Sequence, residues 1–303
     1  MIENQGRRVG DSPDSAPYDF GGNWQPSEIE LTRRIARKQR NKRNALVAAI
    51  SSTLVLGTLV TVLVTSPGWI SLRDTFFKWA YGFEILPKII LGFGTNITLT
   101  IIAGSSVAVI GLIIALIRTS RSPALIPFRF LSMVYVDVFR GIPMILVILL
   151  IGFGVPALRL QGVTNNVLVL GTVAVIITYS AYVAEVIRSG ILTIHPSQRA
   201  AARSLGLSHF QTLRHVVLPQ ALKRVTPPLL NDLVALIKDT GLISILGVTD
   251  AVRAAQIQTA KTFNYTPYVM AALIFLAVTI PLTRATDRML RRTLERQNAQ
   301  GQA

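Results

Sequence analysis

Six long stretches of apolar residues run along the chain, and a polar, mostly charged segment separates each from the next. A helix needs about 20 apolar residues to cross a hydrocarbon core of ~30 Å, and these stretches are about that length or longer. We therefore predict an all-helical membrane protein. The predicted crossings are residues 45–64, 89–117, 125–155, 167–187, 228–246 and 268–290.

The third stretch is too long for one straight crossing. Asp137, Arg140, Gly141 and Pro143 lie within it, and a proline inside a helix removes a hydrogen bond and kinks the backbone. We predict a broken helix whose first part runs partly along the membrane interface.

Basic residues gather in the polar segments that would lie on one side of the membrane. The chain has 31 Lys and Arg against 15 Asp and Glu, a net charge of +16. Clusters occupy residues 33–43, 118–121, 188–224 and 284–296. Because cytoplasmic loops are enriched in Lys and Arg, we place these segments and both termini in the cytoplasm, with the protein in a bacterial plasma membrane.

The same pattern divides the chain into four parts. Residues 1–44 form a disordered, basic cytoplasmic tail. The first 28 are rich in Gly, Pro, Ser, Asp and Asn without hydrophobic periodicity, which predicts disorder, and residues 28–44, with their basic cluster, have helical character. Residues 45–88 hold the first crossing and an external loop. Residues 89–290 form a transmembrane core, and residues 291–303 form a cytoplasmic tail.

Several functions are excluded by what the sequence contains. The charges lie between apolar runs and without a zinc-ligand spacing, which disfavours nucleic acid as a partner. The chain has no cysteine, so thiol catalysis and disulfides are excluded. It has no phosphate-binding loop ending in Gly-Lys-Ser/Thr, and no Ser, His and Asp arrangement typical of hydrolases. We expect neither an enzyme nor a metal or cofactor site, and we expect the three histidines to be solvated.

The cytoplasmic segment 191–220 predicts two short helices. Ser197 is expected to cap the first, and Gly206 suits the left-handed residue that ends it. Ser208 is expected to cap a second helix that stops before Pro219. A helix of roughly nine residues is only about 13 Å long and unstable alone in water, so it implies a docking partner.

Four sequence elements, taken in order, carry a resemblance. They are Phe139-Arg140-Gly141-Ile142-Pro143; Ala181-Tyr182-Val183-Ala184-Glu185 with Arg188-Ser189-Gly190; Ala201-Ala202 with Gly206 and Val216-Val217-Leu218-Pro219; and Leu236-Ile237-Lys238-Asp239-Thr240. Together they resemble the permease subunits of ABC transporters for polar amino acids, over roughly residues 91–290.

The resemblance implies a type I ABC importer permease-like core that forms the translocation path. The loop carrying Ser197, Ala201, Ala202, Gly206, Leu218 and Pro219 would dock an ATPase subunit. Its partners would be an ATPase dimer, a second permease subunit and an external solute-binding protein. The chain itself would hold no cofactor, with ATP bound by the ATPase.

Three residues depart from the family pattern. Ala200 stands where the loop has Glu, Val147 where Gln often occurs, and Gly241 where Ser commonly occurs. The first change removes a carboxylate near a helix start, worth about 0.3 to 1 kcal/mol of helix stability. The crossing at 45–64 is additional to the five-helix core that the family shares.

Charged residues within the predicted crossings are costly unless they are paired or wetted. Arg140, Pro143, Lys238 and Asp239 are candidates for the translocation path or its gate. The alternative is an ionic network among Arg140, Lys238 and Asp239 that only locks helices together.

Other polar residues have structural interpretations. Glu185 and Arg188 have the spacing of a structural pair. Asn231 and Asp232 follow Pro227-Pro228, the expected start of the fifth crossing, and would satisfy backbone donors there. Two other functions stay open from the residues alone: a self-sufficient carrier or channel, and a membrane-anchored scaffold.

Overall fold

The computed structural model describes residues 27–300, which fold as helices joined by short connections, without a strand in that range. The ends of the predicted tails, residues 1–26 and 301–303, lie outside the described residues. The chain divides into two units, Met1–Trp69 and Ile70–Ala303.

The first unit contains one long helix, α1 (Glu28–Thr65). Ser27 begins it, because its hydroxyl accepts a hydrogen bond from the N–H of Glu30 at 3.3 Å. The helix covers both the predicted first crossing and residues 28–44. The helical character predicted for residues 28–44 is confirmed, because the basic residues there are good helix formers that continue the apolar helix. The predicted disorder therefore does not extend to this part of the tail. None of its residues is buried.

The second unit begins with α2 (Trp69–Phe76) and the 41-residue α3 (Trp79–Thr119). A short 3-10 turn, η1 (Pro123–Leu125), leads into α4 (Ile126–Gly141) and α5 (Met144–Leu149). The π-helical η2 (Leu150–Gly154), α6 (Val155–Ala157) and α7 (Val167–Leu192) follow.

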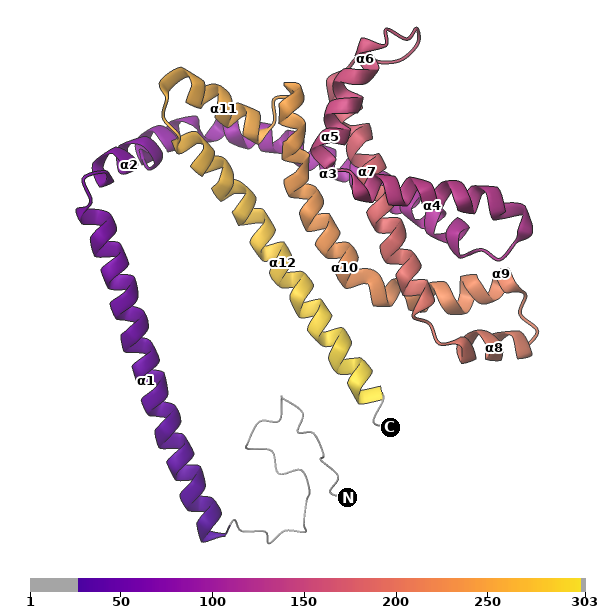
Figure 1. The fold of residues 1–303 in the computed structure, drawn as a ribbon, viewed down its shortest axis with the longest axis horizontal. Helices are drawn as coiled ribbons and strands as arrows, with labels where there is room; N and C mark the ends of the chain where they lie inside the picture. The colour runs from indigo at the N-terminus through magenta and orange to yellow at the C-terminus, as the bar shows by residue number, and fades with distance from the viewer. Residues whose placement is uncertain (1–26, 301–303) are drawn as a thin grey trace. The chain divides into compact units, whose positions relative to one another are not determined.

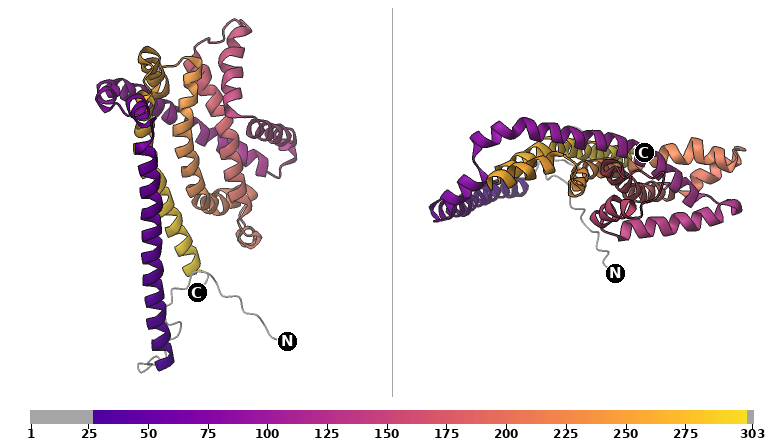
Figure 2. Two further views of the ribbon diagram at one scale, coloured as in Figure 1. Left: turned by 60° about the vertical axis from the view of Figure 1, so that its left-hand side comes forward. Right: turned by 90° about the horizontal axis from the view of Figure 1, so that it is seen from above.

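The remaining helices complete the second unit (Figure 1). They are α8 (Pro196–Ser204), α9 (His209–Thr212), the π-helical η3 (Leu213–Val217), α10 (Leu218–Asp239), the 3-10 η4 (Thr240–Leu246), α11 (Ala251–Thr262) and α12 (Thr266–Gln300). Helix α3 packs against α7, α10 and α12, and α10 packs against α7 and α12 (Figure 2).

Helix α7 forms the centre of the core. Its buried residues include Ala174, Val175, Ala181 and Ala184, all with no exposed surface. Small side chains at these positions let α3, α4 and α10 approach it closely, which is how helices associate where lipid supplies no hydrophobic drive.

The third apolar stretch is broken, as predicted. Helices α4 and α5 meet at an angle of 106°. The break falls at Ile142 and Pro143, where the backbone is extended (ψ 134° and 130°). Residues before a proline avoid helical backbone angles, which explains the position of the bend.

The start predicted for the fifth crossing is wrong. Helix α10 begins at Leu218, and Pro227 and Pro228 lie inside it. Neighbouring helices can satisfy the backbone groups that a proline frees in a membrane helix. Asn231 and Asp232 therefore lie within the helix and do not cap its start.

By length and composition, four helices of the described residues can span a membrane, and the bent pair of α4 and α5–α6 makes a fifth. The sequence predicts six crossings. The difference is α10, which carries five charged residues in 22: Lys223, Arg224, Asp232, Lys238 and Asp239.

A buried polar cluster ties α11 to α3. The side-chain amide of Asn96 donates to Thr240 Oγ1 at 3.3 Å and to Asp250 Oδ2 at 3.0 Å, and its oxygen accepts from the N–H of Ala251 at 3.1 Å. Burial raises the pKa of Asp250, although hydrogen bonds from Arg253 N–H and Asn96 favour its charged form. The cluster fixes the turn between η4 and α11.

Candidate functional site

The loop 191–220, called the coupling loop below, contains α8 and α9. Helix α8 begins at Pro196, and His195 is its cap: Nδ1 of His195 lies 3.2 Å from the N–H of Ser197 and 2.7 Å from its hydroxyl. The prediction that Ser197 caps this helix is therefore wrong. Pro196 explains the difference, because proline favours the first helical position and makes the residue before it extended.

The end of α8 and the start of α9 are as predicted. Gly206 adopts a left-handed conformation (φ +85°). The N–H of Leu207 donates to Ala202 O at 3.2 Å and that of Gly206 to Arg203 O at 2.9 Å, the bonding pattern of a Schellman motif. Ser208 caps α9 in a capping box with Gln211.

The sequence predicts that the second helix of the loop stops before Pro219, and this prediction is wrong. Helix α9, the π-helical η3 and α10 follow one another without a break, and Pro219 lies in the first turn of α10. The N–H of Leu218 donates to Leu213 O, five residues back. This wider turn accommodates a residue that has no N–H to donate. The coupling loop is thus joined by continuous helix to the transmembrane core.

Two large apolar side chains project from the turn between α8 and α9. Leu205 is 83% exposed and Phe210 is 66% exposed. On α8, Ala202 is buried and Ala201 is exposed. The sequence motif did not identify Leu205 and Phe210; the available signal was their apolar character beside Gly206 in an otherwise polar segment.

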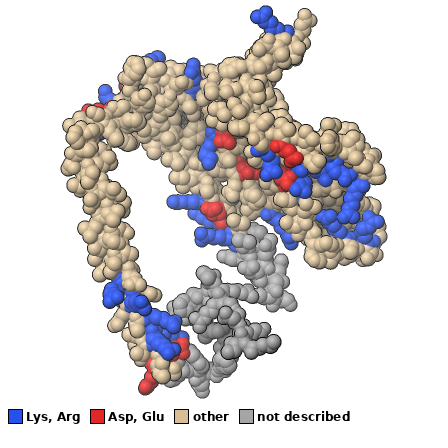
Figure 3. Space-filling model, viewed as in Figure 1, with Lys and Arg blue, Asp and Glu red and all other residues tan. Residues whose placement is uncertain are grey.

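The coupling loop and its flanks carry one sign of charge. No Asp or Glu occurs from residue 186 to residue 231, whereas six Lys and Arg do: Arg188, Arg199, Arg203, Arg214, Lys223 and Arg224. In Figure 3 the surface over α8 and α9 shows blue atoms where no red atoms are seen. Ala200, in place of an acidic residue, leaves the loop uniformly cationic.

The charged candidates of the transmembrane part are connected through two tyrosines. Asp239 Oδ2 accepts from Tyr179 Oη at 2.7 Å. Arg140 Cζ lies 5.8 Å from the centre of the Tyr182 ring, and the rings of Tyr179 and Tyr182 are 6.2 Å apart. Lys238 and Pro143 are exposed. No ion pair joins Arg140, Lys238 and Asp239 in the described part of the chain.

The predicted pair of Glu185 and Arg188 is confirmed and is part of a larger cluster. Glu185 accepts from Arg188 at 2.5 and 2.9 Å and from Arg118 at 2.6 Å. Arg118 lies in the last turn of α3, so this carboxylate fastens the end of α3 to α7. Sequence spacing cannot reveal the partner on α3, which is 67 residues away.

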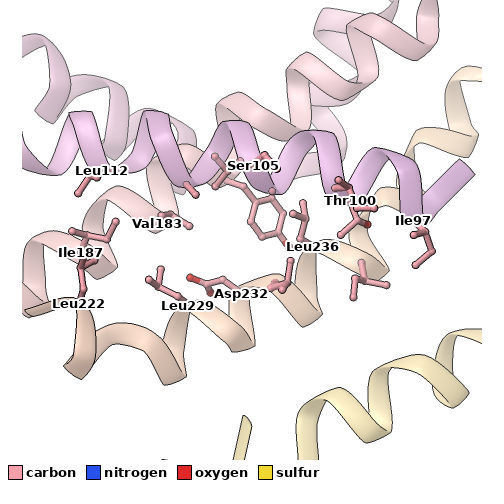
Figure 4. A pocket seen from close by; sticks show the side chains of 17 residues that line it. Ile97, Thr100, Ser105, Leu112, Val183, Ile187, Leu222, Leu229, Asp232 and Leu236 are labelled. Atoms are coloured by element: carbon pink, nitrogen blue, oxygen red, sulfur yellow. The ribbon is translucent and has the colours of Figure 1, made fainter. Parts of the chain in front are cut away.

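A largely apolar cavity of about 740 Å³ lies between α3, α7 and α10. Figure 4 shows Asp232 projecting from α10 among Leu229, Leu236 and other apolar side chains. Asp232 Oδ2 is buried and has no hydrogen-bond partner among the described residues. A carboxylate in such surroundings is costly unless a cation or donor joins it. The cavity can therefore receive a cationic group.

Comparison with known proteins agrees with these features. Residues 108–295 match the family described as "Binding-protein-dependent transport system inner membrane component". The chain belongs to this family. The permease is thus a membrane-embedded component of a transport system, and not a self-sufficient carrier. Helix α1 lies outside the matched residues.

Individual relatives cover the same part of the permease. The arginine transport system permease protein ArtQ of Bacillus subtilis is 34% identical over 203 residues, 65% of this chain and 91% of ArtQ. The putative glutamine transport system permease protein GlnP of Rickettsia conorii is 36% identical over 199 residues, 64% of this chain and 89% of GlnP.

Two solved structures share the fold. An amino acid ABC transporter determined with histidines has a TM-score of 0.61 and 33% identity, covering 68% of this chain and 94% of that one. The MetNI methionine ABC transporter, at 20% identity, has a TM-score of 0.57 and covers 68% and 95%. These similarities confirm the predicted type of fold, an ABC importer permease core.

Proposed function

We propose that this permease forms one half of the path of an ATP-driven importer for polar amino acids, and that its coupling loop docks on a separate ATPase subunit. Leu205 and Phe210 carry the proposal: they are exposed at the one turn that the family motif marks, and an exposed apolar pair on a charged loop favours protein contact. The arginine and glutamine named for ArtQ and GlnP support polar amino acids as the substrate class.

The partners follow from this role. ATP binds to an ATPase dimer, because the permease sequence has no phosphate-binding loop. A second permease subunit completes the path, and an external binding protein delivers the substrate. Both termini and the coupling loop face the cytoplasm, where basic loops are enriched.

The continuous helix from α9 to α10 supplies the mechanical link. Movement of the loop on ATP-driven closure shifts α10, and with it Asp232 in the cavity wall. Asp232 receives the substrate ammonium group in the cavity. Arg140 and Lys238 do not line this cavity, and they attract the substrate carboxylate elsewhere along the path. Asp239 and Pro143 belong to the same path, with Asp239 held by Tyr179.

The test replaces Leu205 with Asp and Phe210 with Ser in the permease reconstituted with its ATPase and binding protein. Burying a large apolar side chain is worth about 1.5 to 3 kcal/mol, so each change weakens ATPase binding by roughly tenfold or more. Substrate-stimulated ATP hydrolysis then falls.

Leu158→Ser is the matched control, because Leu158 is 66% exposed at the end of α6, away from the coupling loop. The proposal fails if the loop variants bind and stimulate the ATPase as the wild type does. Uptake by the permease without any ATPase would instead restore the carrier hypothesis.

A further inference from the structure

A second cavity, of about 400 Å³, lies behind the coupling loop. Its walls come from α8 and α9, from the end of α7, and from Thr119 and Arg121 at the end of α3. It is separate from the apolar cavity that contains Asp232, with which it shares no lining residue. Nothing in the transport cycle proposed above uses it.

Cationic side chains line one part of this cavity. Arg199 and Arg203 lie four residues apart on α8, Arg121 follows the end of α3, and His209 begins α9. None of the three arginines forms an ion pair within residues 27–291. Since residues 186–231 contain no carboxylate, their positive charge is not neutralised from the loop itself.

Two buried polar groups of the same cavity lack partners. Nη2 of Arg199 donates to Ile191 O at 2.7 Å, but its Nε is buried and has no hydrogen-bond partner among the described residues. Thr212 is 4% exposed, and its hydroxyl is likewise unsatisfied. Leaving buried donors unpaired lowers stability, so the combination indicates a ligand with several acceptor oxygens.

We propose that this cavity binds the phosphate group of an anionic phospholipid from the cytoplasmic leaflet. The inference rests on the orientation given under the proposed function. Helices α3 and α7 end at Thr119 and Leu192, which places the cavity at the level of the lipid headgroups. Basic pockets between helices at that level bind such headgroups.

The rest of the cavity fits a lipid better than a soluble anion. Leu192 lines it beside the arginines and is 56% exposed, so it presents apolar surface for the glycerol and first acyl carbons, and the buried Ile191 and Ile194 lie in the same wall. The ATPase is expected at Leu205 and Phe210, neither of which lines this cavity. A bound phosphate would tie α8 to the end of α3, and so set the resting position of the coupling loop.

The test measures lipid binding to the full-length permease in detergent by native mass spectrometry. Phosphatidylglycerol, zwitterionic phosphatidylcholine and inorganic phosphate are titrated separately. We expect selective binding of phosphatidylglycerol. Arg121→Gln and Arg203→Gln should each weaken it by roughly tenfold, and Thr212→Val by roughly threefold, because hydrogen bonds to a charged group are stronger than average.

Arg214→Gln is the matched control, since it makes the same charge change at an exposed position of the coupling loop outside the cavity. The affinity of Arg214→Gln for phosphatidylglycerol should equal that of the wild type. An equal loss of affinity in all three Arg variants would show that the lipid is attracted by the general positive charge of the loop, and would overturn the proposal. Phosphate binding without phosphatidylglycerol binding would overturn it too. Cavity variants that no longer bind the ATPase but still bind phosphatidylglycerol would also overturn the proposal, because the cavity would then bind a carboxylate of the ATPase.

A single-cysteine variant separates this inference from the proposed function. The chain has no cysteine, so Ser204→Cys provides one labelling site on α8. Labelling by an impermeant reagent from outside intact cells would refute the cytoplasmic loop, and with it both proposals. A cytoplasmic loop without lipid selectivity would refute only the lipid site.

Discussion

The crossing of α7 and α10 beside the coupling loop leaves no room for a side chain at Gly190. A β-carbon added there would overlap Cγ1 of Val225 and would lie 3.3 Å from the carbonyl oxygen of Ala221, so a neighbouring side chain and a neighbouring backbone both oppose it. Overpacking a core costs about 1 to 3 kcal/mol. Replacing a helical glycine by alanine returns about 0.5 to 1 kcal/mol. We expect Gly190→Ala to lower the free energy of unfolding by about 1 to 2 kcal/mol.

The overlap with Val225 offers a compensating change. Val225→Ala alone removes buried methyl groups and should cost about 2 kcal/mol. In the double variant the new methyl group of residue 190 occupies the space that Val225 leaves, so the two costs should not add. We expect the double variant to be about 1 kcal/mol more stable than the sum of the single changes predicts.

The assay is reversible unfolding of the purified permease in mixed detergent, followed by far-UV circular dichroism. Gly94→Ala is the control, because Gly94 lies in α3 with no atom within 4 Å of an added β-carbon. It should be neutral or slightly stabilising. If Gly190→Ala behaves like Gly94→Ala, or if Val225→Ala brings no relief, the close crossing described here is wrong.

Three further predictions concern the ion cluster, the cavity and the loop. Glu185→Ala should lower the free energy of unfolding by about 2 to 3 kcal/mol in the same assay, which is less than for a fully buried pair because the Glu185 side chain is 21% exposed. This variant should cost more than Arg188→Ala, because it leaves Arg118, which is 11% exposed, without its partner. Equal effects would contradict this order. Asp232→Asn should lower substrate uptake by proteoliposomes roughly tenfold without lowering the free energy of unfolding, because the buried Oδ2 has no hydrogen bond to lose among the described residues; unchanged uptake would remove Asp232 from the path. Gly206→Val should cost about 1 to 2 kcal/mol and reduce substrate-stimulated ATP hydrolysis, because its φ of +85° strains a β-branched residue; unaltered coupling would separate the turn from the ATPase contact.

The features that follow from local chemistry could be predicted from the sequence. Gly206 acts through its own backbone angles and Ser208 through a side-chain hydrogen bond to Gln211 N–H, only three residues away, and the bend at Pro143 follows from the restricted angles around proline. The predicted helix starts and ends were wrong where two local preferences competed at neighbouring residues, or where the surrounding structure overrode a local preference. Ser197 is a good cap by residue type, but Pro196 precedes it and starts the helix first. Pro219 was expected to end a helix and Pro227 to start one, yet a π turn and the surrounding helices accommodate both within continuous helix.

The two cavities could not be predicted, because they depend on contacts between distant segments. The sequence predicts that Asp232 satisfies backbone donors at a helix start, whereas in the structure it lines a cavity together with residues of α3 and α7. Arg118 and Glu185 lie on different helices, so no spacing rule relates them. The pocket of Arg121, Arg199 and Thr212 likewise exists only because the coupling loop folds back on the end of α3.

The contacts at the base of α10 decide how the coupling loop can act on the cavity. From His209 to Asp232 the helical path is about 36 Å at 1.5 Å per residue, too long for a push on α9 to arrive undiminished if the helix were free to tilt. Two contacts oppose such a tilt of α10. Val225 packs closely against Gly190 of α7, and Arg224 Nη1 donates to Thr193 O at 2.9 Å. These contacts lie just before Pro227 and Pro228, where the helix lacks two N–H donors and bends most easily. If the loop docks an ATPase as proposed, we expect α10 to move with α7 below the prolines and to pivot above them, so that a small displacement of the loop changes the angle at which Asp232 faces the cavity.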